Sequence, residues 1–264
     1  MSNLRGVYIV WYRDLLRFWR DRARLITTFI MPFLFLVIFG TGIASSMMGG
    51  MGGGDFDYIK FMYPGIIGMV VLFNSIMTGV SMVWDREFGF LKEVLVAPVS
   101  RNAVAIGKAL GGATIATTQG IVMLIFIPFA KVSPSAGGVF LMIAVMFVMA
   151  LSLTSMGLFI ASRIRSMEAF QLVVQMVLFP LLFISPAMFP TQFLPSWLGT
   201  ALKFNPFSYG VDAMRQAVLG SQESAMFGIN LFGYRMPIVL DVVVVALFGI
   251  IMATLAIRSF RTQE

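Results

Sequence analysis

Six long apolar stretches alternate with short polar segments along this 264-residue chain. A helix rises about 1.5 Å per residue, so about 20 apolar residues cross the roughly 30 Å hydrocarbon core of a bilayer. We therefore predict an all-α polytopic membrane protein. Its six transmembrane helices are expected at about residues 25–44, 64–84, 104–130, 139–162, 169–189 and 237–257.

Residues 1–24 precede these spans and show the pattern of an amphipathic helix. The apolar stripe consists of Leu4, Val7, Tyr8, Trp11, Leu15 and Phe18, and another face carries Arg13, Arg17, Arg20 and Arg24. Arginines opposite Trp and Phe are typical of a helix lying among lipid headgroups. We expect an interfacial helix as the first unit and a six-span domain over residues 25–264. A solvated helix before the first span is the alternative.

A polar segment, residues 85–101, lies between the uncharged residues 61–84 and 109–130. Phe88, Leu91 and Leu95 recur at the spacing of one helix face, Asp85 is a plausible N-cap and Pro98 a stop signal. A helix of about 12 residues is roughly 18 Å long, too short to cross a bilayer. The pattern predicts a short amphipathic helix outside the membrane, shaped to lay its apolar face into a partner's groove.

Five prolines interrupt the apolar residues 180–206 between the fifth and sixth spans. Irregular backbone at membrane depth is tolerated only where it is buried in protein or lines a cavity. We expect a re-entrant or surface-lying helical pair here. Its second helix begins at Pro206, carries Asp212 and Arg215 three residues apart, and ends at Gly220.

Composition narrows the protein class. Hydrophobic residues make up 59% of the chain, charged residues 12%, and the mean hydropathy is +0.91, which excludes a soluble globular protein. The net charge of +7 does not indicate nucleic acid, because the basic residues stand at the ends of apolar stretches. Fourteen of the 19 Lys and Arg residues fall on the side that holds both termini. By the positive-inside rule, both termini and the 85–101 segment are expected to be cytosolic, with the chain in the cell membrane.

The sequence lacks the residues that several kinds of chemistry require. The chain has no Cys and no His, so thiolate metal sites and His-dependent catalysis are excluded. Gly107-Lys108 is followed by Ala109 and does not form a phosphate loop, so no cofactor is expected on this chain. Ionisable residues near midplane, which ion-coupled exporters use, are missing. The uncharged polar residues Asn74, Gln119 and Gln175 either bond neighbouring helices or line a path.

Residues 84–101 closely resemble the signature of type-2 ABC exporter permeases, nearest to the daunorubicin-resistance and nodulation lipo-oligosaccharide export permeases. Residues 194–198 and 205–215 are similar to the family's segment before its last span. The resemblance covers nearly the whole chain in the same order. It implies a two-fold membrane dimer, a homodimer in preference to a heterodimer, that carries separate ATP-binding-cassette subunits holding ATP and Mg. Extracytoplasmic helices would correspond to residues 189–219.

The resemblance also implies a cytosolic coupling surface made of the N-terminal helix and the helix at residues 87–95. The residues expected to contact the ATPase are Arg86, Glu87, Phe88, Gly89, Leu91 and Leu95, together with Trp11, Arg13, Arg17 and Arg20 of the N-terminal helix.

The sequence thus predicts the permease subunit of an ATP-binding-cassette exporter, a transport subunit and not an enzyme. Its partners would be an ATPase, a second permease subunit and membrane lipid. An uncharged path suits an amphiphilic, lipid-like, glycolipid or drug cargo better than a small ion. The alternatives are an ion-coupled secondary exporter and a passive assembly scaffold.

Overall fold

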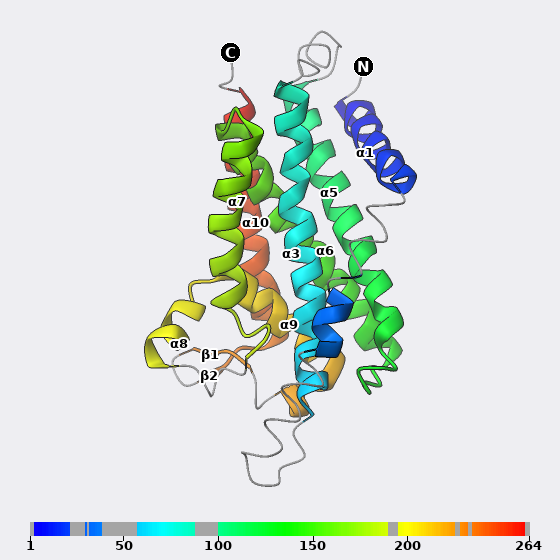
Figure 1. The fold of residues 1–264 in the computed structure, drawn as a ribbon, viewed down its shortest axis with the longest axis vertical. Helices are drawn as coiled ribbons and strands as arrows, with labels where there is room; N and C mark the ends of the chain where they lie inside the picture. The colour runs from blue at the N-terminus through cyan, green and yellow to red at the C-terminus, as the bar shows by residue number, and fades with distance from the viewer. Residues whose placement is uncertain are drawn as a thin grey trace.

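The computed structural model describes residues 3–21, 30, 32–38, 57–87, 100–189, 195–224, 228–231 and 234–261. These residues are mostly helical and form an upright bundle of long helices (Figure 1). Most of the first predicted span, residues 25–44, lies outside the described residues, although Ile30 and residues 32–38 are helical. The centre of the polar segment, residues 88–99, also lies outside them.

Four helices in the described part of the chain are long and apolar enough to cross a membrane. They are α3 (Tyr58–Glu87), α5 (Arg101–Met123), α6 (Ala136–Arg163) and α10 (Ile238–Arg261). A 3-10 turn, η1 (Leu124–Phe126), extends α5, and α7 (Met167–Phe183) is a shorter apolar helix. The helical membrane class is therefore confirmed, while the count of six spans stays a prediction.

Serine side chains begin three of these helices. The hydroxyl oxygens of Ser100, Ser135 and Ser166 each accept a hydrogen bond from the backbone N–H three residues later, at 3.0–3.3 Å. Each bond satisfies one of the N–H groups that a helix start leaves without an intrahelical partner. Polar caps therefore fix where α5, α6 and α7 begin.

Small residues let the central helix α6 approach its neighbours closely. A Cβ atom added to Gly79 of α3 would lie 2.7 Å from the carbonyl oxygen of Gly157 of α6, and one added to Gly157 would lie 2.6 Å from that of Ile76. On the other side of α6, Ser152 Oγ donates to the carbonyl oxygen of Val245 of α10 at 2.9 Å. Close backbone contact and interhelical hydrogen bonds are the usual means of packing helices in lipid.

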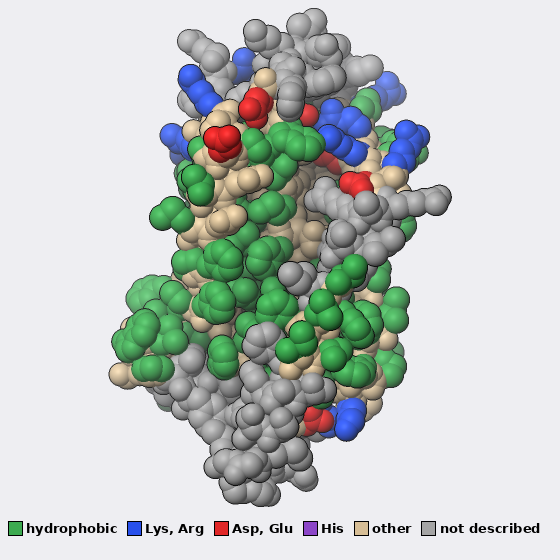
Figure 2. Space-filling view, in the orientation of Figure 1, with side chains coloured by type: hydrophobic (Ala, Val, Ile, Leu, Met, Phe, Trp, Pro, Cys, Tyr) green, Lys and Arg blue, Asp and Glu red, His purple; other side chains and the backbone are tan. Residues whose placement is uncertain are grey.

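Apolar side chains cover the middle of the bundle on the face drawn in Figure 2. Figure 2 shows apolar side chains over this region and most of the charged side chains gathered at one end. α1 (Asn3–Arg20) and the last turn of α10 lie at that same end (Figure 1). We call it the arginine-rich end. Charge at the ends and apolar side chains between them suit a molecule surrounded by lipid.

The opposite end holds the short elements between α7 and α10 (Figure 1). These are α8 (Ser196–Leu202), α9 (Pro206–Glu223) and an antiparallel pair of two-residue strands, β1 (Asn230–Leu231) and β2 (Tyr234–Arg235). Gly220 breaks α9 with a φ of 77°, a conformation that glycine adopts without strain. The predicted stop at Gly220 thus coincides with a real break, after which the chain makes one further turn.

Three predicted boundaries differ from the structure. Asp85 does not cap a new helix, because α3 continues without interruption to Glu87 and places Asp85 in its last turn. The helix also begins before residue 64, at Tyr58, where Asp57 Oδ1 accepts a hydrogen bond from the Ile59 N–H. The helix of the third span ends at Phe126 and not at residue 130; Pro128, just beyond it, has no backbone N–H to continue the helical hydrogen bonding.

Candidate coupling surface

Helix α1 packs along the first half of α5 at the arginine-rich end (Figure 1). Gly107 of α5 makes this approach possible, since a Cβ atom there would lie 2.8 Å from Val10 Cβ and 2.9 Å from the Val7 carbonyl oxygen. Further along the same two helices, Trp11 Nε1 of α1 donates a hydrogen bond to Thr114 Oγ1 of α5 at 3.1 Å. Backbone contact and a directed hydrogen bond therefore hold α1 against the membrane helices.

The buried face of α1 overlaps the predicted apolar stripe without matching it. Gly6, Val10 and Phe18 are buried against the bundle, whereas Leu4 is 81% exposed and Tyr8 59% exposed. The other stripe residues, Val7, Trp11 and Leu15, are half-buried. The sequence pattern therefore located most of the inner face but did not include Gly6 and Val10, and glycine adds nothing to an apolar stripe.

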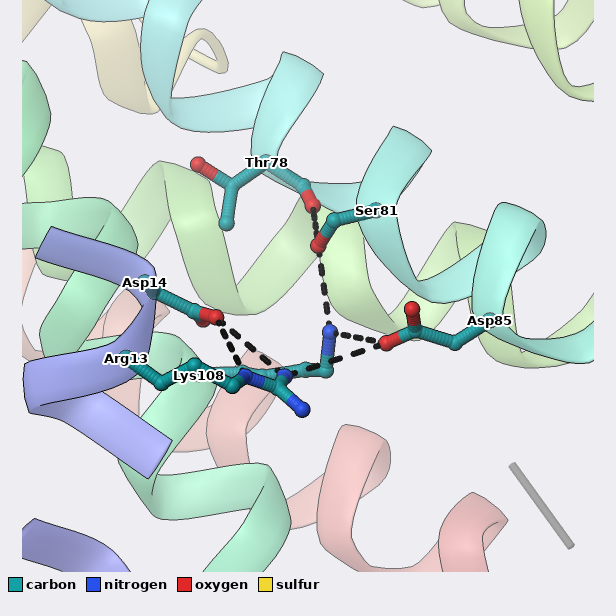
Figure 3. A network of polar contacts seen from close by, with 6 residues as sticks. All are labelled: Arg13, Asp14, Thr78, Ser81, Asp85 and Lys108. Carbon is teal, nitrogen blue, oxygen red and sulfur yellow. Dashed lines mark hydrogen bonds and ion pairs between the residues drawn. The ribbon is translucent and has the colours of Figure 1, made fainter. Parts of the chain in front are cut away.

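Lys108 is the centre of a polar network that joins α5 to α3 (Figure 3). Its side chain is buried, with the whole residue only 1% exposed. Lys108 Nζ lies 2.8 Å from Asp85 Oδ2 and donates a second hydrogen bond to Ser81 Oγ at 3.1 Å. Ser81 Oγ in turn donates to the Thr78 carbonyl oxygen at 2.9 Å. The ammonium group of this buried lysine is thus paired with a carboxylate of the neighbouring helix.

Helix α1 joins the same network through Arg13. Arg13 Nη2 lies 3.2 Å from Asp14 Oδ1 and 4.0 Å from Asp85 Oδ2 (Figure 3). Asp85 therefore faces cations from two helices, a buried one on α5 and a half-exposed one on α1. An isolated buried ammonium is strongly unfavourable, so the Asp85 carboxylate is a structural requirement for Lys108.

The other predicted contact residues are only partly described. Glu87 is exposed at the end of α3, and Arg86 lies in the same last turn. Phe88, Gly89, Leu91 and Leu95 lie outside the described residues. Arg20 is exposed at the end of α1, and Arg17 Cζ lies 6.0 Å from the ring centroid of Trp84 of α3.

A cleft of about 450 Å³ opens between α1, α3 and α5 beside this network. Its lining is mixed: Asp14, Arg17 and Asp21 of α1 face Asn74, Thr78 and Trp84 of α3. Of the three predicted path-lining residues, only Asn74 lines it. Gln119 is buried inside the bundle, and Gln175 is exposed on α7. The structure does not bring these three side chains together.

A second polar cluster, which the sequence reasoning did not predict, joins α9 to α10 at the opposite end. Gln216 Nε2 donates to Asp241 Oδ2 at 2.8 Å, to Asp212 Oδ2 at 3.3 Å and to the Met236 carbonyl oxygen at 3.1 Å. Asp212 Oδ2 also accepts from the backbone N–H of Ile229 at 3.1 Å. Asp212 and Asp241 are both fully buried.

Arg215, also fully buried, stands beside this cluster. Its guanidinium donates to the Pro186 carbonyl oxygen, and its Cζ atom lies 4.1 Å from the ring centroid of Phe61. Burial raises the pKa of the Asp212 carboxyl above its ordinary value, an effect that the nearby Arg215 opposes. Asp212, Arg215 and Gln216 at i, i+3 and i+4 share one helix face, which is the signal that could have revealed the cluster.

Comparison with known proteins identifies the family. The family model described as ABC-2 type transporter matches residues 5–219. The putative transport permease ycf38 of Pyropia yezoensis is 31% identical over 77% of this chain and 70% of its own length. The inner membrane transport permease YadH of Escherichia coli K12 is 28% identical over 80% of this chain and 82% of its own.

The probable multidrug ABC transporter permease YbhR of Escherichia coli K12 is 30% identical over 62% of this chain, which corresponds to 45% of its own length. The family model covers more than three quarters of the chain and includes both α1 and the 85–101 segment. The apolar helices described above are of the length and composition that such a permease needs. The chain therefore belongs to the ABC-2 type transporter family and is a membrane transport permease.

Proposed function

We propose that this chain forms the translocation path of an exporter powered by a separate ATP-binding-cassette ATPase, which binds ATP and Mg and docks on the 85–101 segment and α1. The observation that carries the proposal is the buried Lys108–Asp85 ion pair. Asp85 precedes the centre of that segment in α3, and Lys108 follows it in α5. The ion pair therefore joins the two helices that the segment connects. A force applied to the segment then reaches α3 and α5 together.

Helix α1 extends the same surface. It is joined to α5 by the Trp11–Thr114 hydrogen bond and faces Asp85 through Arg13. Three helices at the arginine-rich end thus meet at one carboxylate. A partner that moves the 85–101 segment would move α1, α3 and α5 as a unit, which is the behaviour required of a surface that converts ATP-driven motion into opening of a membrane path.

The cleft between α1 and α3 supports an amphiphilic cargo. Its wall combines charged groups of α1 with the hydroxyl and amide groups of Asn74, Thr78 and Ser81 and with apolar side chains. A polar headgroup with an attached apolar body matches such a wall. We infer a lipid-like, glycolipid or drug-like cargo that enters beside α1.

The charge distribution supports an orientation in which the arginine-rich end is cytosolic, with both termini on that side of the cell membrane and six spans in all. We further propose that two copies assemble around a two-fold axis, because α7 leaves most of its apolar surface uncovered. The ATPase subunits would then dock on the cytosolic face of the pair.

The proposal is tested by replacing Leu91, on the predicted apolar face, with Asp. A charge buried in an apolar groove is unfavourable by several kcal/mol, enough to weaken docking by orders of magnitude. Leu91→Asp is expected to lose the ATPase that co-purifies with the unmodified chain and to lose transport-stimulated ATP hydrolysis at equal membrane levels. Glu93→Asp, two residues away and off the apolar face, is the matched control and should retain both.

Two outcomes would support the alternatives. If no ATPase co-purifies with the unmodified chain and no transport is measured, a passive scaffold fits better. If vesicles transport cargo under a proton gradient without ATP, an ion-coupled exporter fits better, and the buried carboxylates Asp212 and Asp241 become its candidate ion site. Retention of the partner and of stimulated hydrolysis by Leu91→Asp would contradict the coupling role of the segment.

A further inference from the structure

An apolar groove of about 370 Å³ lies on the membrane-facing side of the bundle between α5, α6 and α10. Small residues make it deep, among them Ala109 of α5 and Ala253 of α10. Exposed isoleucines, Ile106 and Ile250, border it. Ser152 and Ser155 line it, and both hydroxyls already donate to backbone carbonyl oxygens of α6 or α10. An occupant must therefore be apolar.

The groove has the length of one bilayer leaflet. It runs along α6 from Phe147 to Leu158 and along α10 from Ala246 to Ile257. At about 1.5 Å per residue, each path is roughly 17 Å long. Half of a hydrocarbon core of about 30 Å is about 15 Å. An extended acyl chain from one leaflet would fill the groove from end to end.

Two arginines lie near one end of the groove, where the headgroup of a bound lipid would be. Arg101 is exposed one helical turn beyond Ala105, on the same face of α5, and Ala105 lines the groove. Arg258 is exposed next to Ile257, which lines the groove on α10. Beyond the groove, Ser162 Oγ and Ser259 Oγ are hydrogen-bonded at 2.7 Å and join α6 to α10. The groove therefore ends close to two arginines at the arginine-rich end.

We propose that this groove binds one anionic phospholipid, with an acyl chain between α5, α6 and α10 and the phosphate at Arg101 and Arg258. The depth and length of the groove and the charge of the two arginines all fit this occupant. A surface groove in a membrane-spanning bundle is also within reach of lipid. The site is distinct from the cleft beside α1 and from the exposed face of α7. The proposal rests on the membrane location of the family and not on the ATPase partner.

The test measures retained lipid. The full-length chain is purified in mild detergent, incubated with dioleoylphosphatidylglycerol or with neutral dioleoylphosphatidylcholine, and examined by native mass spectrometry. The unmodified chain is expected to retain phosphatidylglycerol in preference to phosphatidylcholine. Ala253→Phe fills the groove and should abolish retention of both lipids. Arg101→Gln leaves the groove open and should abolish only the preference for the anionic lipid.

Matched controls separate this site from general lipid coating. Ala144→Phe makes the same change at an exposed position of α6 outside the groove, and Arg165→Gln removes an exposed arginine at the same end of the molecule. Both should bind like the unmodified chain. The proposal is overturned if Ala253→Phe retains lipid normally or if both controls lose it too.

A second copy of the chain is the competing occupant of the groove. Because the chain has no cysteine, Ile250→Cys introduces a single thiol at the border of the groove. Efficient disulfide cross-linking between copies at this position in membranes would show that protein and not lipid covers the groove. Absence of the cross-link, together with lipid retention, supports the proposal.

Discussion

A lysine in an apolar bundle needs a compensating charge, and Lys108 finds one in Asp85. In the part of the chain that the structure describes, Asp85 is the carboxylate within ion-pair distance of Lys108 Nζ. The two partners are not equivalent. Lys108 is almost completely buried, whereas the Asp85 side chain keeps 16% of its surface exposed and also faces Arg13. Loss of either partner therefore has a different consequence.

This asymmetry gives a prediction. Asp85→Asn leaves a buried ammonium without its counter-charge and should lower the free energy of unfolding by about 3–5 kcal/mol. Lys108→Met removes the buried charge and leaves Asp85 near Arg13, so its effect should be smaller. Thermal unfolding of the purified chain in detergent, followed by fluorescence, measures both.

The double variant Asp85→Asn with Lys108→Met completes the cycle. It should be more stable than Asp85→Asn alone, because no unpaired charge remains. Equal unfolding temperatures for Asp85→Asn and the unmodified chain would show that the ion pair contributes nothing to the fold.

Single residues were the hardest part to predict from the sequence. The sequence pattern marked Asp85 as an N-cap and gave no reason to pair it with Lys108, 23 positions further along the chain. The same holds for Asp212 and Asp241, which Gln216 bridges. Such pairs arise when two helices meet with a particular rotation, and a single sequence does not specify that rotation.

At the scale of elements, the docking of α1 on α5 depends on glycine. Gly107→Ala should displace α1, because the new Cβ atom would meet backbone and Cβ atoms of α1 below 3 Å, and overpacking of this kind is unfavourable by about 1–3 kcal/mol. Gly111→Ala is the matched control, since its Cβ atom would lie 3.3 Å from Asp14 Cβ. The two variants make the same change on the same face of α5, one turn apart.

Limited trypsin digestion of membranes measures this displacement, because α1 carries several arginines. Cleavage within α1 should be faster in Gly107→Ala than in the unmodified chain, and unchanged in Gly111→Ala. Equal rates in all three proteins would mean that contact at Gly107 does not hold α1 in place.

The long helices were the best predicted elements. Long uncharged stretches leave few alternatives to a membrane helix, so α6 and α10 follow their predicted spans within a few residues. Helix ends were less predictable, because hydropathy carries no information about where the backbone hydrogen bonds of a helix end. α3 continues past Trp84 into polar sequence, and α7 ends at Phe183 although apolar residues follow.

For the whole molecule, α7 indicates where a second copy would dock. It buries one residue per turn, Phe170, Val174, Leu178 and Leu182, against the rest of the bundle. Gln171 and Gln175 are exposed on it beside large apolar side chains. Amide groups facing lipid lack hydrogen-bond partners, whereas a neighbouring helix can supply them.

Single cysteines in the cysteine-free chain test this arrangement. Met176→Cys on α7 should form a disulfide-linked dimer when membranes are oxidised. Phe140→Cys on α6 is the control, because Phe140 and Met176 are equally exposed at 76% but lie on different helices. Cross-linking at Phe140 and not at Met176 would place the second copy on the other side of the bundle.

The orientation of the molecule is tested by a reporter fused after Glu264. Fourteen of 19 basic residues on the side of the termini predict that this end stays in the cytosol. A fluorescent protein that matures only in the cytosol should therefore be bright, whereas a phosphatase that is active only after export should be silent. The reverse result would invert the proposed topology.

The buried Asp212 has a consequence for biosynthesis. Its carboxylate is held by the Ile229 N–H and by Gln216, which is itself oriented by Asp241 of α10. Helix α9, with Gln216 in it, is complete in the nascent chain before Ile229 and Asp241 have been translated. Until Ile229 follows, the Asp212 carboxylate therefore lacks the backbone N–H that holds it in the finished chain. A ribosome that stalls before residue 229 leaves this carboxylate only partly satisfied, which is a chemical difference between an unfinished permease and a finished one.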